Sequence, residues 1–373
     1  MDAATLTARA RELAPVMAER AAEAERLRRL PDQTIADLRD ADFFRAVVST
    51  ERGGHGLSPS VIPAVATEFA QGCVSTGWVT GFFMVHNWLV AQFPDSAQDE
   101  VLVDGYVLAP AALSPTATAT PVEGGYTLSG RSPWATGIHH CNWVMLTGMV
   151  HDAAGAVVDA RMFMLPLADV MIDEVWHTDG MRGTGSDTIV TEGAFVPAHR
   201  SISMLELANP ASGVPFVPLL AAVAAAPAVG AAIGAVDAFA DRIRTRVLAY
   251  TLGQEAKERP VAQMRIGRAR ADVDTAEALL DRTVRETLAG PLDPLAIARL
   301  RLGAAKAVEV SRTAIADCCA AAGGSVHFVS EPLQRFQRDV NTLSGHAIFD
   351  LDRAAESYGR LAVGLPSDPM QFL

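Results

Sequence analysis

The sequence predicts an α+β protein in three parts: an N-terminal helical domain (1–105), a middle antiparallel β-barrel or β-sandwich domain (106–205) and a C-terminal four-helix bundle (214–373). Three observations predict this order. Apolar residues recur at helical spacing near the N-terminus. Short β-rich runs separated by Gly, Pro, Asn and Asp occupy the middle. Long helical patterns return after Pro215 and continue almost to the C-terminus.

Each part carries its own signals. In the first, apolar spacing predicts a helix in 34–48, and the Gly-, Ser- and Pro-punctuated stretch 49–62 predicts a loop before the next helix. In the second, the β-rich runs predict strands in 125–130, 142–150, 160–167, 171–178 and 186–197. In the third, helix boundaries are expected near 253–260, 289–294 and 321–328.

Composition excludes several classes of protein. The formal net charge of −12 argues against a nucleic-acid partner, because phosphate binding relies on clustered Lys and Arg. Two long uncharged stretches, Phe69–Pro94 and Val214–Val236, are expected to be buried helices, since polar residues or prolines interrupt them. The N-terminus has no apolar leader, and the four cysteines show neither a CxxC pair nor metal-ligand spacing. We expect a cytoplasmic protein with no membrane contact and no metal.

The usual cofactor and nucleophile motifs do not occur in this chain. No strand is followed by GxGxxG, and there is no GxxxxGK[ST] phosphate loop, HExxH helix or GxSxG elbow. A nucleotide or flavin cofactor would therefore have to be held by a different architecture.

Three stretches carry a resemblance to a known family: 130–148, 176–200 and 332–352. Together with the order of helical, β and helical parts, they resemble the acyl-CoA dehydrogenase superfamily. Within it the chain is similar to the flavin monooxygenases that receive reduced flavin from a separate reductase. The resemblance implies reduced FMN or FAD as cofactor, molecular oxygen as co-substrate, a small-molecule substrate and a homotetramer.

The resemblance also implies the flavin-binding residues. Trp134, Thr136 and Gly137 fill the positions beside the flavin ring, with Thr where related monooxygenases more often have Ser. A flavin N5 needs a hydrogen-bond partner, which a Thr hydroxyl or a backbone amide supplies. Thr136 could instead simply end a strand.

The second stretch adds further flavin candidates. Its Gly-rich segment offers hydrogen-bond donors from Arg182, Thr184 and Ser186. By resemblance, Trp176 covers the flavin and Ser186 lies near the ring or the phosphate. The alternative is a structural turn between two strands. Further along the chain, Arg246 and Gln263 occupy the region that contacts the flavin of a neighbouring subunit in the superfamily.

The third stretch decides the predicted chemistry. Common acyl-CoA dehydrogenases place a catalytic Glu eight residues after the Asp of an Arg-Asp pair; here the pair is Arg338-Asp339 and the eighth position is Ala347. His346 precedes it and matches a histidine of the hydroxylating relatives. Its side chain can exchange a proton near neutral pH. Helical spacing predicts Asp339 and His346 on one helical face, and a surface pair between Arg335 and Asp339.

Substrate contacts are expected from an apolar helix and from a His-His pair. Trp78, Phe82 and His86 belong to the helix that lines the substrate side of the ring in these relatives, although core packing would also explain them. His139 and His140, as neighbours in a strand, should face opposite ways. We expect one of them near the pocket and name His140.

The sequence therefore predicts the oxygenase component of a two-component flavin monooxygenase that hydroxylates an aromatic or polyketide-type substrate through a flavin C4a-hydroperoxide, with His346, Thr136 and His86 as catalytic candidates. N-oxygenation of an amine or amino sugar is an alternative. A second is an acyl-CoA dehydrogenase with a relocated base, for which Glu255 is poorly placed at a helix end. A third is a scaffold that binds no flavin.

Overall fold

The computed structural model describes residues 1–208, 210, 212–248 and 251–367. Five helices form the N-terminal part: α1 (Ala3–Leu27), α2 (Asp32–Asp40), α3 (Val61–Ala70), α4 (Val74–Val90) and α5 (Asp95–Val101). Every residue of α4 is buried. This explains its mostly apolar sequence, since a helix covered on all sides has no polar face, and its few polar side chains, such as His86 and Asn87, are buried as well. The expected buried helix in Phe69–Pro94 is confirmed.

A single seven-stranded sheet follows, in the order β5-β6-β2-β1-β3-β4-β7. The strands are β1 (Ala111–Val122), β2 (Gly125–Ala135), β3 (Trp143–His151), β4 (Val157–Pro166), β5 (Met171–Asp173), β6 (Asp187–Pro197) and β7 (Ser201–Ser203). The pairs are antiparallel except β1 and β3, which run parallel. The all-antiparallel expectation is therefore wrong for one pair.

Two details of the sheet differ from the predicted strands. β1 was not among the predicted strands. Its residues are buried irregularly rather than alternately, so its sequence lacks the alternating apolar pattern that marks a strand. The predicted strand 171–178 ends at Asp173, and the chain then forms an irregular connection. Asp187 holds that connection by accepting the backbone N–H of Trp176 at 2.8 Å. This long-range bond has no signature in the local sequence.

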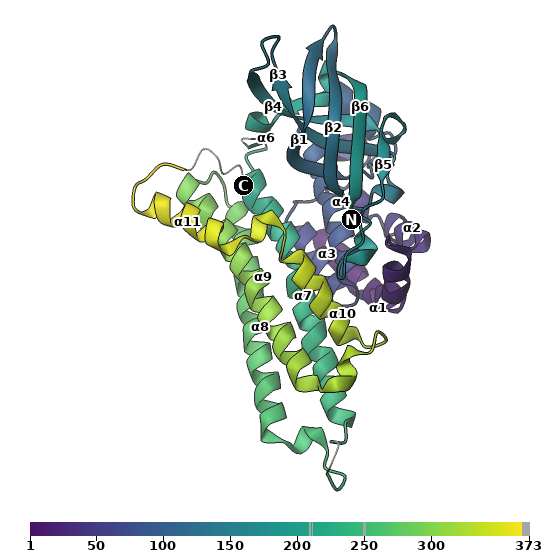
Figure 1. The fold of residues 1–373 in the computed structure, drawn as a ribbon, viewed down its shortest axis with the longest axis vertical. Helices are drawn as coiled ribbons and strands as arrows, with labels where there is room; N and C mark the ends of the chain where they lie inside the picture. Colours follow the sequence, from purple (N-terminus) through teal and green to yellow (C-terminus); the bar gives the residue numbers. More distant parts are fainter. Residues whose placement is uncertain (209, 211, 249–250, 368–373) are drawn as a thin grey trace.

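Helices return in the C-terminal part: α6 (Met204–Ala208), α7 (Phe216–Thr245), α8 (Pro260–Thr287), α9 (Pro294–Ala322), α10 (Pro332–Leu343) and α11 (Leu351–Ala362). Three of them are long, and the place of the expected fourth long helix is taken by the shorter α10 and α11. Figure 1 shows the bundle extending away from the sheet, with the N-terminal helices packed beside the junction. The predicted fold class is confirmed.

Helix α7 is long and apolar enough to cross a membrane by length and composition alone. However, 89% of its most apolar window is buried inside the protein, against α3, α4, α8 and α9. The central helix of a protein core can have the same length and composition, and the apolar surface of α7 is already covered by these neighbouring helices. The expected burial of Val214–Val236 agrees with this packing for the residues within α7.

Candidate active site

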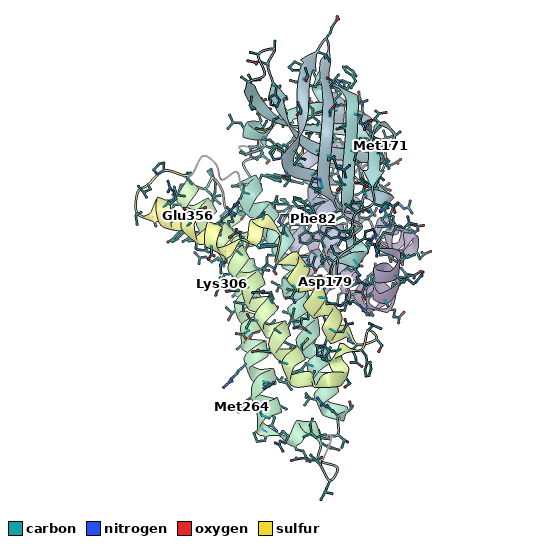
Figure 2. All side chains as sticks on the ribbon, in the orientation of Figure 1. Phe82, Met171, Asp179, Met264, Lys306 and Glu356 are labelled. Carbon is teal, nitrogen blue, oxygen red and sulfur yellow. The ribbon has the colours of Figure 1, made fainter. Side chains whose placement is uncertain are left out.

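One face of α4 begins the candidate site. Trp78, Phe82 and His86 are spaced four residues apart and so project from the same side of the helix. The Trp78 and Phe82 ring centroids are 4.5 Å apart, and those of Phe82 and His86 are 5.5 Å apart. His346 adds a fourth ring, 5.9 Å from Trp78. We call these four side chains the ring row. Phe82 lies near the junction of sheet, N-terminal helices and bundle (Figure 2).

The backbone around Ala109 determines the tautomer of His86. Its Nδ1 lies 2.7 Å from the Ala109 carbonyl oxygen, which can only accept, so Nδ1 carries the proton. Asn87 holds this segment in place through hydrogen bonds with both the N–H and the carbonyl of Val107. Burial lowers the pKa of His86 to about 4, against a smaller opposing effect of the Ala109 carbonyl. His86 is therefore neutral at pH 7 and has a free lone pair on Nε2.

His346 has the opposite tautomer. Its Nδ1 accepts the backbone N–H of Ile348 at 3.2 Å, so the proton of the neutral ring sits on Nε2. Burial lowers its pKa to about 4, although the residue as a whole is only half-buried. The ring row thus ends in an acceptor at His86 and a donor at His346.

The expected helical stripe through Asp339 and His346 is wrong. Helix α10 ends at Leu343, and His346 caps a separate 3-10 turn, Ala347–Phe349. The backbone N–H groups of Gly345 and His346 bond to carbonyls three residues back, so the chain tightens and leaves the α-helical path. His346 reaches the ring row because the chain turns there.

Four hydrogen bonds connect the ring row to the segments that follow β2 and precede β6. The Trp78 Nε1–H donates to Thr136 Oγ1 at 3.2 Å, and Thr136 Oγ1 lies 3.1 Å from Ser186 Oγ. Ser186 Oγ lies 2.8 Å from Thr184 Oγ1, which donates to the Met181 carbonyl at 2.9 Å. We call this series the hydroxyl chain. All of its residues are buried. Thr136 therefore does more than end a strand.

A buried carboxylate anchors the segment that carries the hydroxyl chain. Asp339 accepts the backbone N–H of Met181 at 2.6 Å, and the Trp176 Nε1–H donates to the Met181 carbonyl at 3.0 Å. The expected pair between Arg335 and Asp339 is wrong: Arg335 binds Glu25 of α1 at 3.0 Å instead. Asp339 points into the protein, where its hydrogen bond with the Met181 N–H satisfies two buried polar groups at once.

Trp134 and Gly137 flank Thr136 in a distorted strand end. Trp134 has φ +65° and is 60% exposed, so its ring does not pack into the core. Gly137 has φ +74°, and a Cβ there would lie 2.5 Å from the Phe83 ring. Only glycine fits this position. The register between β2 and β6 also shifts between Ser132 and Ala135, which frees the segment for this geometry.

The two adjacent histidines lie in a 3-10 turn, Ile138–His140, and not in a strand as expected. His139 Nε2 is 2.7 Å from an Asp187 carboxylate oxygen. His140 is directed toward α2, with Nδ1 3.6 Å from Asp32, and burial lowers its pKa to about 4. No contact found among the described residues joins His140 to the ring row, so the structure gives no support to its substrate role.

Three other predicted flavin residues lie outside this cluster. Arg182 is exposed and donates to the Thr178 carbonyl. Arg246, at the end of α7, donates to the carbonyl of Ala322. Gln263, near the start of α8, donates to the carbonyl of Lys257. Figure 2 shows Met264, next to Gln263, near the bundle tip far from Phe82. Arg246 and Gln263 therefore cannot reach this chain's own Thr136.

Sequence reasoning missed several residues that shape the site. Asn87, Met181 and Asp187 contribute through hydrogen bonds between a side chain and a backbone group elsewhere in the chain, and no local sequence pattern marks such bonds. Asp339 was noticed but assigned to the surface. Within the ring row, the four-residue spacing of Trp78, Phe82 and His86 on α4 is a local signal, whereas no local pattern brings His346 to them.

Comparison with known proteins identifies the family. Two family models match: acyl-CoA dehydrogenase, N-terminal domain, over residues 3–103, and acyl-CoA dehydrogenase, C-terminal domain, over 222–351. A pigment production hydroxylase of a Rhodococcus species is 37% identical over 97% of this chain and 97% of its own. The flavin-dependent monooxygenase oxygenase subunit HsaA of Rhodococcus jostii is 35% identical, over 95% of this chain and 97% of that protein. The chain belongs to the flavin-dependent monooxygenase branch of the acyl-CoA dehydrogenase family.

A solved structure places a reduced flavin on this fold. The Streptomyces protein XiaF, in complex with FADH2 and glycerol, superimposes on this oxygenase with a TM-score of 0.91 and 30% identity, covering 99% of this chain and 97% of its own. The predicted family, fold and enzyme class are confirmed: the protein is a flavin-dependent oxygenase component, supplied with reduced flavin by a separate reductase.

The residues of this oxygenase fit such a cofactor. The Thr136 backbone N–H is already bound to the Trp134 carbonyl and that of Gly137 to the Thr184 carbonyl, so neither can meet a ligand, whereas the Thr136 hydroxyl oxygen has a second lone pair besides the one that accepts from Trp78. Trp78 and the exposed Trp134 supply flat apolar surfaces of the kind that pack against an isoalloxazine ring. The roles of the individual residues remain predictions.

Proposed function

We propose that this oxygenase hydroxylates a phenolic ring held along the ring row between His86 and His346. The observation that carries the proposal is the pair of opposite histidine tautomers at the two ends of an aromatic row. A flat substrate with a hydroxyl group matches this arrangement, because the rings offer stacking surfaces and His86 offers an acceptor for the hydroxyl proton.

His86 would orient the phenol and share its proton. Its Nε2 lone pair accepts the O–H, which raises electron density on the aromatic ring as the proton moves toward nitrogen. The low pKa of His86 means that the proton is returned when the reaction ends. His346 would donate its Nε2–H to an oxygen atom at the other end of the row. The two histidines therefore divide the work of accepting and donating hydrogen.

Reduced flavin together with molecular oxygen supplies the oxygenating equivalent when it is bound. Thr136 would meet the ring edge, Trp134 and Gly137 would flank it, and Trp176 and Ser186 would hold the surrounding segment. Arg182 is available at the surface for an anionic group of the cofactor. Arg246 and Gln263 would reach it only from a neighbouring subunit, as in the homotetramer that the family resemblance implies. We propose a cytoplasmic location, since all four cysteines are free.

The alternatives have less support. A dehydrogenase needs a carboxylate beside the substrate, whereas Ala347 takes that position, Asp339 faces the Met181 N–H, and Glu255 lies beyond the end of α7. N-oxygenation of an amine would use the same flavin chemistry. An amine substrate that is protonated at pH 7 would have to lose its proton before oxygenation, and neutral His346 offers it a donor and no counter-charge.

Turnover with separated components tests the proposal. The oxygenase is mixed with a flavin reductase, NADH and either simple phenols or alkylamines, and product is measured together with released hydrogen peroxide. We expect product from phenols alone and none when the reductase is omitted. Anaerobic bleaching of bound oxidised flavin by an acyl-CoA would restore the dehydrogenase, and products from amines alone would establish N-oxygenation. If the chain binds no flavin, the scaffold alternative holds.

A further inference from the structure

The hydroxyl chain runs between a group that can only donate and a group that can only accept. At one end is the indole N–H of Trp78, and at the other the backbone carbonyl of Met181. Three hydroxyl groups lie between them, on Thr136, Ser186 and Thr184. The two links between hydroxyl oxygens, at 3.1 Å and 2.8 Å, have no direction of their own, because either oxygen could be the donor.

Counting hydrogens removes that ambiguity. The indole and the three hydroxyls hold one hydrogen each, and the series contains four hydrogen bonds. Since Thr184 donates to the carbonyl, it must accept from Ser186. Ser186 must then accept from Thr136, and Thr136 accepts from Trp78. Burial makes this the favoured state, because an unmade hydrogen bond in a buried site costs the desolvation of its polar atoms.

The direction of the chain limits what Thr136 can offer a ligand. Its only hydroxyl hydrogen is committed to Ser186, and its backbone N–H is bound to the Trp134 carbonyl. One lone pair on Oγ1 accepts from Trp78, and the other remains. A ligand that meets Thr136 must therefore be a hydrogen-bond donor.

We propose that Thr184 and Ser186 are positioning residues that hold the Thr136 hydroxyl as an acceptor, so that the site favours reduced over oxidised flavin. The proposal rests on the proposed function, which puts the edge of the flavin ring at Thr136, and on the expectation from the family resemblance that the atom at this edge is N5. Reduced flavin carries a hydrogen on N5 and can donate it, whereas oxidised N5 has only a lone pair. Two acceptors facing each other gain no hydrogen bond and lose hydration.

Anaerobic binding measurements on variants test this proposal. The dissociation constants of oxidised and dithionite-reduced FMN and FAD are measured for the wild type, Ser186→Ala and Thr184→Val, with thermal melting to verify folding. Ser186→Ala removes the acceptor of the Thr136 hydrogen. Thr184→Val removes the acceptor of the Ser186 hydrogen, which then has only Thr136 Oγ1 to bind within the hydroxyl chain, so in both variants the Thr136 hydrogen can turn toward the ligand. We expect the ratio of oxidised to reduced dissociation constants to fall about twofold to tenfold, the effect of one neutral hydrogen bond. Thr184→Val is the sharper test, because Thr184 acts on Thr136 only through Ser186.

Two further variants separate hydrogen-bond direction from packing. Trp78→Phe removes the donor at the other end of the chain but leaves the Thr136 hydrogen directed at Ser186, so the affinity can fall while the ratio does not. Thr147→Val removes a buried hydroxyl elsewhere in the sheet, bonded to Met204 Sδ, and should leave the ratio unchanged. An unchanged ratio in both Ser186→Ala and Thr184→Val, or an equal fall in Trp78→Phe, would overturn the proposal. Failure of the wild type to bind either redox form would instead refute the proposed function.

Discussion

Asp339 on α10 accepts the backbone N–H of Met181 at 2.6 Å, across 158 residues of sequence. This contact holds Met181, whose carbonyl ends the hydroxyl chain. Met181 has φ +53°, a left-handed conformation that is uncommon for a residue other than glycine. A carboxylate oxygen on a buried N–H group secures a backbone conformation that the local sequence would not hold alone. Asp339 is thus connected to the candidate site through Met181.

The first prediction concerns the charge of Asp339. Burial raises its pKa to about 7; Glu25 also raises it, while the Met181 N–H, Arg338 and Arg335 oppose the shift. The folded pKa is above the unfolded value of 3.8, so the carboxyl's stabilising effect is present below 3.8 and is lost as the pH rises through 7. Asp339→Asn keeps an oxygen acceptor without the charge.

We therefore expect Asp339→Asn to melt progressively higher than the wild type as the pH rises from 5 to 8, and the difference to level off above the pKa. Differential scanning calorimetry across this range measures it. Asp317→Asn, at an exposed position of α9, is the control and should show no such trend. Parallel melting of wild type and Asp339→Asn at every pH would show that Asp339 does not titrate in this range.

The second prediction concerns acid stability. Burial lowers the pKa of His86 and of His140 to about 4, below the unfolded value of 6.5. The stability from keeping them neutral is complete above 6.5 and is lost as the pH falls toward 4, because the unfolded chain binds protons there and the folded chain does not. In His140→Gln, the pH slope of the unfolding free energy should become shallower by up to about 1.4 kcal/mol per pH unit in this window. Urea titrations at several pH values measure it; an unchanged slope would contradict the buried neutral state of His140.

The third prediction separates the roles of the two histidines in turnover. His346→Leu removes the Nε2–H donor, and we expect about 100-fold less product, with the oxygen consumed released as hydrogen peroxide. His346→Gln restores an N–H donor and should recover part of the coupling between oxygen consumption and product. Glutamine should not replace His86 in the same way. With a neutral phenol as substrate, we expect His86→Gln to recover less of the coupling than His346→Gln, since an amide is a much weaker base than imidazole. Equal coupling in His346→Leu and His346→Gln would argue that the donor is unimportant.

The fourth prediction concerns Gly137. Alanine at this position has both an unfavourable φ of +74° and a Cβ only 2.5 Å from the Phe83 ring. Gly155→Ala is a matched control, because its φ is +83° and no atom lies within 4 Å of the added Cβ. We expect a loss of about 1 kcal/mol for Gly155→Ala from the backbone alone, and about 1–3 kcal/mol more for Gly137→Ala from the clash. Equal losses in chemical denaturation would mean that Phe83 moves away without cost.

Periodicity and punctuation predicted the order of helical, β and helical parts, because each regular element repeats its apolar residues with its own period. They also predicted five strand positions, of which only the run 171–178 was much too long. The substitution of Ala347 for a catalytic carboxylate was visible as a position in the sequence. Motif resemblance then supplied the flavin and the enzyme class, which the comparisons confirm.

The sequence by itself determined the fold class, the family and the residue types available for catalysis. Only the tertiary structure decided which of those residues meet: His346 leaves the helix of Asp339 to join Trp78, Asp339 turns inward to Met181, and His140 faces α2. The same holds for hydrogen-bond direction in the hydroxyl chain. Local patterns report the period of an element, whereas these contacts join residues many positions apart, and their partners are selected by packing and by the need to satisfy buried polar groups.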